Sequence, residues 1–211
     1  MKIASVNVGL PQKVTFQGKE ISTGIFKSPT NEPVMVRKLN LDGDRQADLR
    51  VHGGVAKAVY AYPQQHYAGW KQDFPQHDFP TAVFGENLTV DGLDETTVNI
   101  GDQFLAGECE LQATQPRFPC FKLGIRFGDP KMIRHFLQRN QPGVYFSVIK
   151  EGSVQAGDSL TLLKKSDSQL TITDIVRLYA IDKNDKEGIE VAANDPYLPE
   201  DWRTYFAKKL Q

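Results

Sequence analysis

The sequence predicts a mainly β protein: a β-barrel or tightly curled sheet with a few inserted helices, followed by a small helical segment. Over the first 165 or so residues, short apolar–polar alternations are divided by turns, and 17 glycines and 12 prolines favour those turns. After a polar stretch at residues 164–168, helical spacing replaces strand spacing. We therefore expect a β body over residues 1–165 and a three-helix extension over residues 166–211.

Individual strands of the body are expected where apolar residues alternate or cluster between turns. They fall at residues 4–8, in a hairpin over 14–21, and at 34–41, 55–62, 87–90, 103–105 and 108–114. Pro63 ends one of them and suits the first turn of a helix through Trp70, because proline fits a helix start. A further helix is expected over residues 129–139, with Pro130 at its start.

The extension is expected to contain three short helices. They cover residues 173 to about 181, residues 185–193, and the segment from Pro199, where Trp202, Phe206 and Leu210 recur every four residues. Residues 182–201 hold seven acidic residues and two lysines, a net charge of −5. Roughly 45 residues are too few for an independent core, so the extension should pack on the body or on a partner.

Composition and charge narrow the class of protein. Lys and Arg number 25 against 26 Asp and Glu, which argues against a protein that binds nucleic acid by neutralising phosphates. No apolar run reaches the roughly 18 to 20 residues that cross a membrane, and the first residues lack the apolar stretch of a signal peptide. Two cysteines do not form a disulfide framework in a chain of 211 residues. We expect a cytoplasmic protein with reduced thiols.

The two cysteines occupy different sequence contexts. Cys109 shares the apolar face of a strand with Leu111 and Ala113, so it is most simply a small core residue. Cys120 follows two prolines, which favour a loop at a strand end. Arg117 and Lys122 lie close by, and nearby cations stabilise the thiolate that a nucleophile or soft-metal ligand requires. The alternative is a buried cysteine beside a solvated basic helix, since residues 115–139 carry a net charge of +5.

A second group of residues surrounds a pair of glycines. Gly53 and Gly54 allow close approach of backbone to a ligand, and their N–H groups can form an anion-binding nest. The basic residues around this turn, which would suit a phosphate, are Arg45, Arg50, His52 and Lys57. A surface turn with charges balanced by Asp42, Asp44 and Asp48 remains the alternative. A third segment places Glu86 and Asn87 at a strand start, a pattern that by itself is more typical of a turn.

The sequence contains no motif for several other kinds of site. The four histidines and two cysteines show no ligand-pair spacing, which argues against a structural zinc site. No glycine-rich nucleotide loop and no nucleophile elbow occurs.

Taken together, three segments of the chain resemble the YiiM-type MOSC-domain proteins, named after the carboxy-terminal domain of molybdenum cofactor sulfurase. The matching segments are residues 48–60, 84–89 and 115–123, the last reading QPRFPCFKL. Each is weak alone, but their order and spacing make the match specific. The resemblance covers nearly the whole chain, because that group also carries a three-helix extension after its barrel.

The resemblance implies a closed β-barrel related to the pyruvate kinase barrel, which binds the molybdenum cofactor (molybdopterin with molybdenum). It implies Cys120 as the protein ligand to the metal. It also implies reduction of N-hydroxylated compounds such as 6-hydroxylaminopurine, which would detoxify mutagenic base analogues. The family is sometimes described as binding pyridoxal phosphate, but no residue pattern here requires that.

The residues and the resemblance agree in chemistry. Thiolate is an apt ligand for a soft metal, and the cofactor's phosphate is an anion that the glycine turn suits. Arg117 or His52 would assist the departing oxygen of an N–OH group. The expected catalytic residues are thus Cys120, His52 and Arg117, and the expected cofactor-binding residues are Arg45, Arg50, His52, Gly53, Gly54, Lys57, Glu86, Asn87, Arg117 and Lys122.

The redox-cofactor motifs that the chain lacks indicate which protein partner a reductase of this kind would need. Two cysteines cannot hold an iron–sulfur relay and no flavin motif occurs, so electrons for a reductase must come from an external donor protein. The acidic extension is a candidate docking surface for that donor, with simple packing as the alternative. The sequence leaves a homodimer as one option for the oligomeric state. The other functions considered are a carrier of molybdenum cofactor or of persulfide sulfur on Cys120, and a redox-sensing thiol protein without metal.

Overall fold

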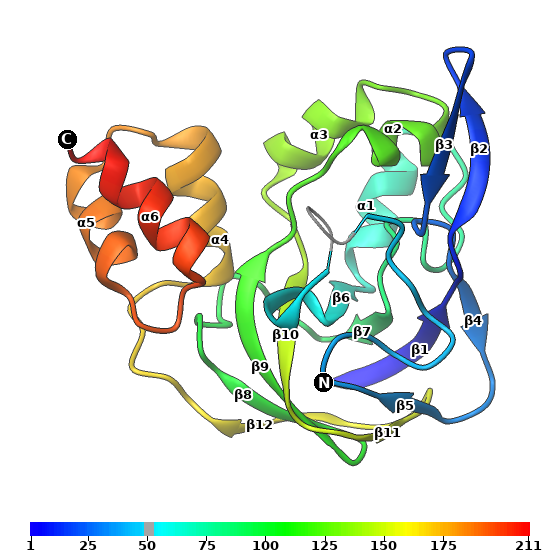
Figure 1. The fold of residues 1–211 in the computed structure, drawn as a ribbon, viewed down its shortest axis with the longest axis horizontal. Helices are drawn as coiled ribbons and strands as arrows, with labels where there is room; N and C mark the ends of the chain where they lie inside the picture. The colour runs from blue at the N-terminus through cyan, green and yellow to red at the C-terminus, as the bar shows by residue number, and fades with distance from the viewer. Residues whose placement is uncertain (49–52) are drawn as a thin grey trace.

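The computed structural model describes residues 1–48 and 53–211. A large mixed sheet forms the body, with strands in the order β12-β8-β9-β10-β6-β7-β1-β4 (Figure 1). In chain order these strands are β1 (Lys2–Val8), β4 (Ser28–Thr30), β6 (Val59–Pro63), β7 (Leu88–Asp91), β8 (Gln103–Ala106), β9 (Cys109–Pro116), β10 (Val144–Lys150) and β12 (Leu160–Lys164). Strands β6 and β7 pair in parallel, and the other neighbours pair antiparallel.

Two small sheets complete the β structure. The hairpin of β2 (Gln12–Phe16) and β3 (Lys19–Thr23) confirms the expectation at residues 14–21. Strand β5 (Val34–Val36) pairs with β11 (Gly152–Val154), so the strand expected over 34–41 ends early. Likewise, the strand expected at 55–62 begins as a 3-10 turn, η1 (Val55–Lys57), before β6.

The prediction of a closed barrel is wrong, because the main sheet of the described residues keeps two edges, at β12 and β4. The sheet curls until its β12 edge reaches the start of β1, the strand next to the β4 edge, where Lys2 and Ser159 form an isolated bridge. The N–H of Leu160 donates to Met1 O at 3.0 Å at this point. Two more backbone hydrogen bonds join Ile3 to the turn before β12: the N–H of Ile3 donates to Asp158 O at 2.9 Å, and the N–H of Gly157 donates to Ile3 O at 2.8 Å. From Val6 onward, β4 pairs with β1 instead.

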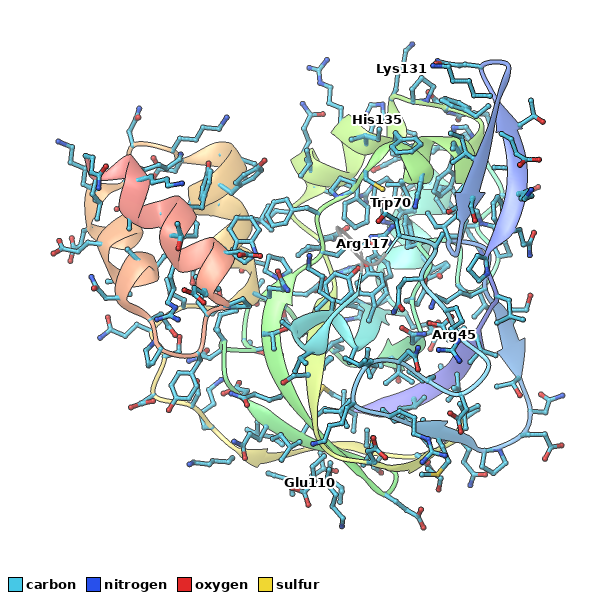
Figure 2. All side chains as sticks on the ribbon, in the orientation of Figure 1. Arg45, Trp70, Glu110, Arg117, Lys131 and His135 are labelled. Atoms are coloured by element: carbon cyan, nitrogen blue, oxygen red, sulfur yellow. The ribbon has the colours of Figure 1, made fainter. Side chains whose placement is uncertain are left out.

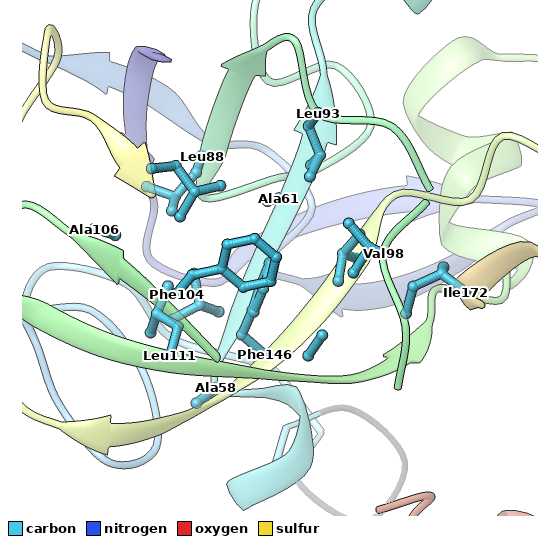
Figure 3. Packing of buried hydrophobic residues seen from close by; sticks show 14 of the residues in the cluster. Ala58, Ala61, Leu88, Leu93, Val98, Phe104, Ala106, Leu111, Phe146 and Ile172 are labelled. Carbon is cyan, nitrogen blue, oxygen red and sulfur yellow. The ribbon is translucent and has the colours of Figure 1, made fainter. Parts of the chain in front are cut away.

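An aliphatic core fills the concave side of this curled sheet (Figure 3). Phe104 of β8 and Phe146 of β10 meet edge to face, with ring centroids 5.8 Å apart. Leu88, Leu111 and Cys109 are fully buried in the same cluster. Burial of each large apolar side chain contributes roughly 1.5–3 kcal/mol, so this cluster is the main source of the body's stability.

A second, aromatic core lies under three helices at one end of the sheet (Figure 1). The helices are α1 (His66–Asp73), α2 (Phe121–Phe127) and α3 (Met132–Arg139). Trp70 of α1 is fully buried, and its indole N–H donates to the Tyr62 hydroxyl at 2.7 Å. Helices α1 and α3 were expected, whereas α2, which begins directly after Cys120, was not.

The extension forms a compact unit beside the sheet (Figure 1). It consists of α4 (Ile172–Val176), a π-helical turn η2 (Arg177–Ile181), α5 (Lys186–Asn194) and α6 (Glu200–Lys209). Thr171 and Asp174 form a reciprocal capping box at α4, and the Asp185 carboxylate accepts the N–H of Gly188 at 2.9 Å at α5. Such caps satisfy N–H groups that a helix start leaves unpaired. The three expected helices are confirmed, and the first begins slightly earlier than expected.

The extension packs tightly on the body at Gly101. This glycine has a φ of +88°, and a Cβ placed on it would lie 2.5 Å from Cγ of Tyr197 in the extension. Close by, the N–H of Ile172 donates to Val98 O at 3.0 Å. None of the helices in the described ranges has the length and apolarity needed to span a membrane.

Candidate functional site

A cavity opens where the curled sheet meets the aromatic core, and it collects residues from distant parts of the chain. Its walls come from the segment after β3, the loop before η1, the starts of β6 and β10, the segment before β7, and the segment between β9 and α2. The lining residues are Thr23, Gly24, Ile25, Lys27, Arg45, Gln46, Ala47, Gly53, Lys57, Tyr60, Gly85, Asn87, Arg117, Phe118, Cys120, Lys122 and Tyr145.

Cys120 reaches this cavity because β9 stops before it. Pro116 is the last strand residue, and Cys120 is the extended residue from which α2 begins, with φ −120° and ψ 177°. Its side chain is half-buried. Cys109, at the other end of β9, is fully buried, and its thiol donates to Ala106 O at 3.1 Å. Burial raises the pKa of Cys109 to about 12, which keeps that thiol protonated.

Arg117 is the most deeply placed cation of the wall. It is 8 % exposed, and its guanidinium lies over the Tyr60 ring at 5.0 Å and the Phe136 ring at 5.7 Å. In Figure 2 it lies in the middle of the body, whereas Lys131 lies at the margin. Within the described residues, no group accepts a hydrogen bond from its Nη1. A buried donor left unpaired is costly, so an acceptor in the cavity would stabilise this arrangement.

Lys27, in the wall, forms a buried ion pair with Asp44 behind the wall, and sequence reasoning missed this pair. Their side chains are 8 % and 0 % exposed. Asp44 also accepts the N–H of Gly9 at 3.1 Å and the amide of Asn87 at 3.0 Å. Burial lowers the pKa of Lys27, although Asp44 opposes that shift. Lys27 occurs in no motif, and Asp44 was counted among surface charges, so only the fold brings the pair together.

The neighbouring residues Glu86 and Asn87 have different positions. Asn87 lines the cavity, and its side-chain oxygen accepts the N–H of Tyr60 at 3.1 Å. Glu86 is fully buried behind the wall, where it accepts hydrogen bonds from the Tyr67 and Thr89 hydroxyls. Its Oε2 finds no partner in the described part of the chain, and burial raises the pKa of its carboxyl.

The glycine turn forms another side of the cavity. Gly53 lines it with a φ of +106°, and Gly54, with φ +88°, precedes η1 without lining the cavity. Both values fall in the region that favours glycine. Lys57 of η1 is half-buried and faces the same cavity. The expected ligands Arg50 and His52 lie outside the described residues.

The charge of the wall is strongly positive. Five lining residues are cations, namely Lys27, Arg45, Lys57, Arg117 and Lys122, and no carboxylate lines the described wall. A half-buried thiol therefore faces a cavity that favours anions. The fold brings together Cys120, Arg45, Gly53, Lys57, Asn87, Arg117 and Lys122, as the sequence predicts, and leaves Gly54 and Glu86 at its margin.

Comparisons with known proteins agree with this geometry. The MOSC domain family matches residues 48–161, and the YiiM-like, 3-alpha helix domain matches residues 170–211. The protein YflK of Bacillus subtilis (strain 168) is 41% identical over 98% of this chain and 93% of its own. The crystal structure of YiiM from Geobacillus stearothermophilus superposes with a TM-score of 0.83 at 32% identity, covering 100% of this chain and 99% of that one.

A more distant relative has a name that describes its activity. A protein of Gibberella moniliformis (strain M3125 / FGSC 7600) named "Reductase" is 30% identical over 76% of this chain, which covers 29% of that protein. The family match and the whole-length relatives carry the assignment. The chain belongs to the MOSC-domain family, in the YiiM-like group that adds a three-helix domain.

Proposed function

We propose that the cavity binds the molybdenum cofactor with Cys120 as the protein ligand to molybdenum, and that the protein reduces N-hydroxylated compounds such as 6-hydroxylaminopurine. Such an activity would detoxify mutagenic base analogues. The observation that carries the proposal is a half-buried thiol in a cavity walled by five cations, one of which has an unpaired buried N–H.

The described residues fit this cofactor in chemical character. A thiolate is a soft ligand and suits molybdenum, which the cofactor holds through soft dithiolene sulfurs. The cofactor also carries a phosphate, and cations with backbone N–H groups hold phosphates well. A bare hard cation such as Mg²⁺ would prefer carboxylates, which do not line the described wall.

Different parts of the wall would take different parts of the ligand. Cys120 supplies the thiolate, and Arg117 beside it supplies a buried donor. Arg45, Lys57 and the turn at Gly53 form the side that suits the phosphate. Asn87 acts on the wall itself, since it ties β6 to Asp44 by the hydrogen bonds described above.

The reaction requires electrons and protons in equal number. An N-hydroxylated substrate takes up two electrons and two protons, its N–O bond breaks, and an amine and a water molecule leave. The bound cofactor supplies a centre able to pass two electrons, and an external donor protein restores them. The chain itself supplies protons and orientation.

Lys27 is the proton source that the described wall supports best. Its ammonium lines the cavity, Asp44 holds it in place, and burial lowers its pKa, which makes the proton easier to release. Tyr60 is less suited, because burial raises its pKa and its hydroxyl already donates to Pro142 O at 2.8 Å. The reductase name of the Gibberella relative supports the class of reaction.

The first experiment measures molybdenum and pterin in protein purified from a host that makes the cofactor. We expect near-stoichiometric metal and pterin in the parent and in Cys109→Ser, and molybdenum depleted in Cys120→Ser. Absence of both from all three proteins would overturn the proposal.

Turnover separates an enzyme from a carrier. With an artificial electron donor, the loaded protein should convert 6-hydroxylaminopurine to adenine. Full metal content without any turnover would favour a non-catalytic carrier of the cofactor.

A further inference from the structure

The segment from Gln115, near the end of β9, to Cys120, just before α2, is held from two sides. On the body side, Arg117 packs over Tyr60 and Phe136. On the other side, Gln115 and Phe118 both face the three-helix extension. The segment that ends in Cys120 is therefore bounded by the body and the extension together, although the extension contributes no residue to the cavity lining.

The contact at Gln115 is a directed hydrogen bond. The indole N–H of Trp202, in α6, donates to Gln115 Oε1 at 2.7 Å. The amide nitrogen of Gln115 donates to Ala56 O at 3.3 Å, in the turn that carries Lys57. An indole N–H can only donate and a carbonyl can only accept, so the two partners determine the orientation of the Gln115 amide. Gln115 is 4 % exposed, and its unpaired amide would be costly.

The contact at Phe118 is aromatic. The Phe118 ring lines the cavity, two residues before Cys120. It meets the Trp202 ring at a centroid distance of 4.9 Å in a tilted arrangement. It meets the Tyr179 ring of η2 at 4.6 Å, nearly edge to face. Ring pairs at such distances contribute roughly 0.5–1.5 kcal/mol beyond their buried area. One residue of the extension, Trp202, thus contacts the segment at both Gln115 and Phe118.

We propose that Trp202 is a positioning residue, through which the three-helix extension holds the cysteine segment and the Lys57 turn in the geometry of the cavity. This positioning role depends on the proposed function in one respect: the proposed function is what assigns the chemistry of the cavity to Cys120. The contacts themselves exist without cofactor, so the inference can be tested on the cofactor-free protein.

The test is the rate at which iodoacetamide alkylates each cysteine at a fixed pH, followed by peptide mass spectrometry. Cys109 serves as an internal control, because its buried thiol becomes accessible only when the body opens. Trp202→Phe keeps a ring and removes the indole N–H, whereas Gln115→Met removes the partner amide at similar volume. Loss of the Trp202–Gln115 hydrogen bond should raise the Cys120 rate about three- to tenfold in each variant and leave Cys109 unchanged; Gln115→Met, which also removes the hydrogen bond to Ala56 O, should give the larger rise of the two.

Two further variants separate positioning from general loosening. The double variant Gln115→Met/Trp202→Phe should label at about the rate of Gln115→Met, because Trp202→Phe removes no hydrogen bond that Gln115→Met leaves in place. Ile189→Val, a buried change in α5 away from the segment, should leave the Cys120 rate at the parent value.

Three results would overturn the inference: rates within twofold of the parent in both single variants, an equal rise in Ile189→Val, or a rise at Cys109 in proportion to Cys120. Absence of molybdenum from the purified protein would contradict the proposed function, but the alkylation rates would still test the positioning role of Trp202.

Discussion

Cys109 and Cys120 belong to the two ends of one strand and have opposite environments. At the start of β9, Cys109 is fully buried in the aliphatic core, and its thiol donates to a backbone carbonyl. Four residues beyond the end of β9, Cys120 is half-buried in a cavity with five cations in its wall. The residue type is the same, but the position of the strand end decides whether the thiol packs in the core or faces a cavity.

The difference shows how a strand end makes a site. While the chain remains in the sheet, its side chains alternate between the core and the outer face. Pro116 ends the ladder, and the following residues turn their side chains toward both the cavity and the extension.

The largest effect is expected from the cysteines themselves. Cys120→Ala should abolish turnover of 6-hydroxylaminopurine, because it removes the thiolate that would bind the metal. Cys109→Ala should leave turnover largely intact. Steady-state assays on both variants, matched for cofactor content where loading permits, measure the contrast. Equal activity of the two variants would contradict the assignment.

A smaller effect, about a hundredfold in kcat, is expected from Lys27→Arg, which keeps the charge beside Asp44 but holds its proton too tightly to donate it. The parent should lose activity as pH rises through the Lys27 pKa, which burial lowers, because the deprotonated amine cannot donate. The variant should lack this alkaline decline. A kcat within twofold of the parent, at equal molybdenum content, would exclude Lys27 as the proton source.

The anion preference of the cavity can be tested without cofactor. Arg117→Met should weaken binding of molybdate about tenfold in calorimetry, since a charged hydrogen bond is worth roughly 1.5–3 kcal/mol. Arg126→Met is the matched control, because Arg126 packs over Phe26 and does not line the cavity. Equal losses in the two variants would mean that net charge alone attracts the anion.

The smallest effect concerns Glu86, behind the wall. Burial raises the pKa of its carboxyl in the folded state, so the folded protein binds this proton more tightly than the unfolded chain. Its contribution to stability is therefore complete below the unfolded pKa and is lost as pH rises through the folded one. Glu86→Gln should flatten the decline in the free energy of unfolding, measured with urea, that the parent shows as pH rises above the ordinary pKa of a glutamate carboxyl. A parallel decline in parent and variant would contradict this origin.

Local signals predicted the extension and the main elements of the site. The helix start at Asp185 has a side-chain cap, and the start at Pro199 rests on the fixed φ of proline; the sequence displays both residues directly. Cys120 stood out because prolines precede it and cations flank it. Such signals need only a few consecutive residues.

Contacts between segments that are far apart in the sequence could not be predicted in the same way. Lys27 and Asp44 lie in two irregular loops, and only the curl of the sheet brings their side chains together. Helix α2 has no side-chain cap and is seven residues long, so its sequence shows no clear start. The barrel remains open because β4, and not β12, pairs with the second half of β1. The alternation of apolar and polar residues does not reveal which of these two strands will pair there.

Gly101 has a consequence for how the two parts of the chain can be combined. Any side chain at position 101 would intrude on the ring of Tyr197, so it would act as a wedge between body and extension. An extension grafted onto another MOSC body would need a residue without a side chain at that place. A body without the extension would have no Tyr197 ring at this place, and only the φ of +88° would still favour glycine there.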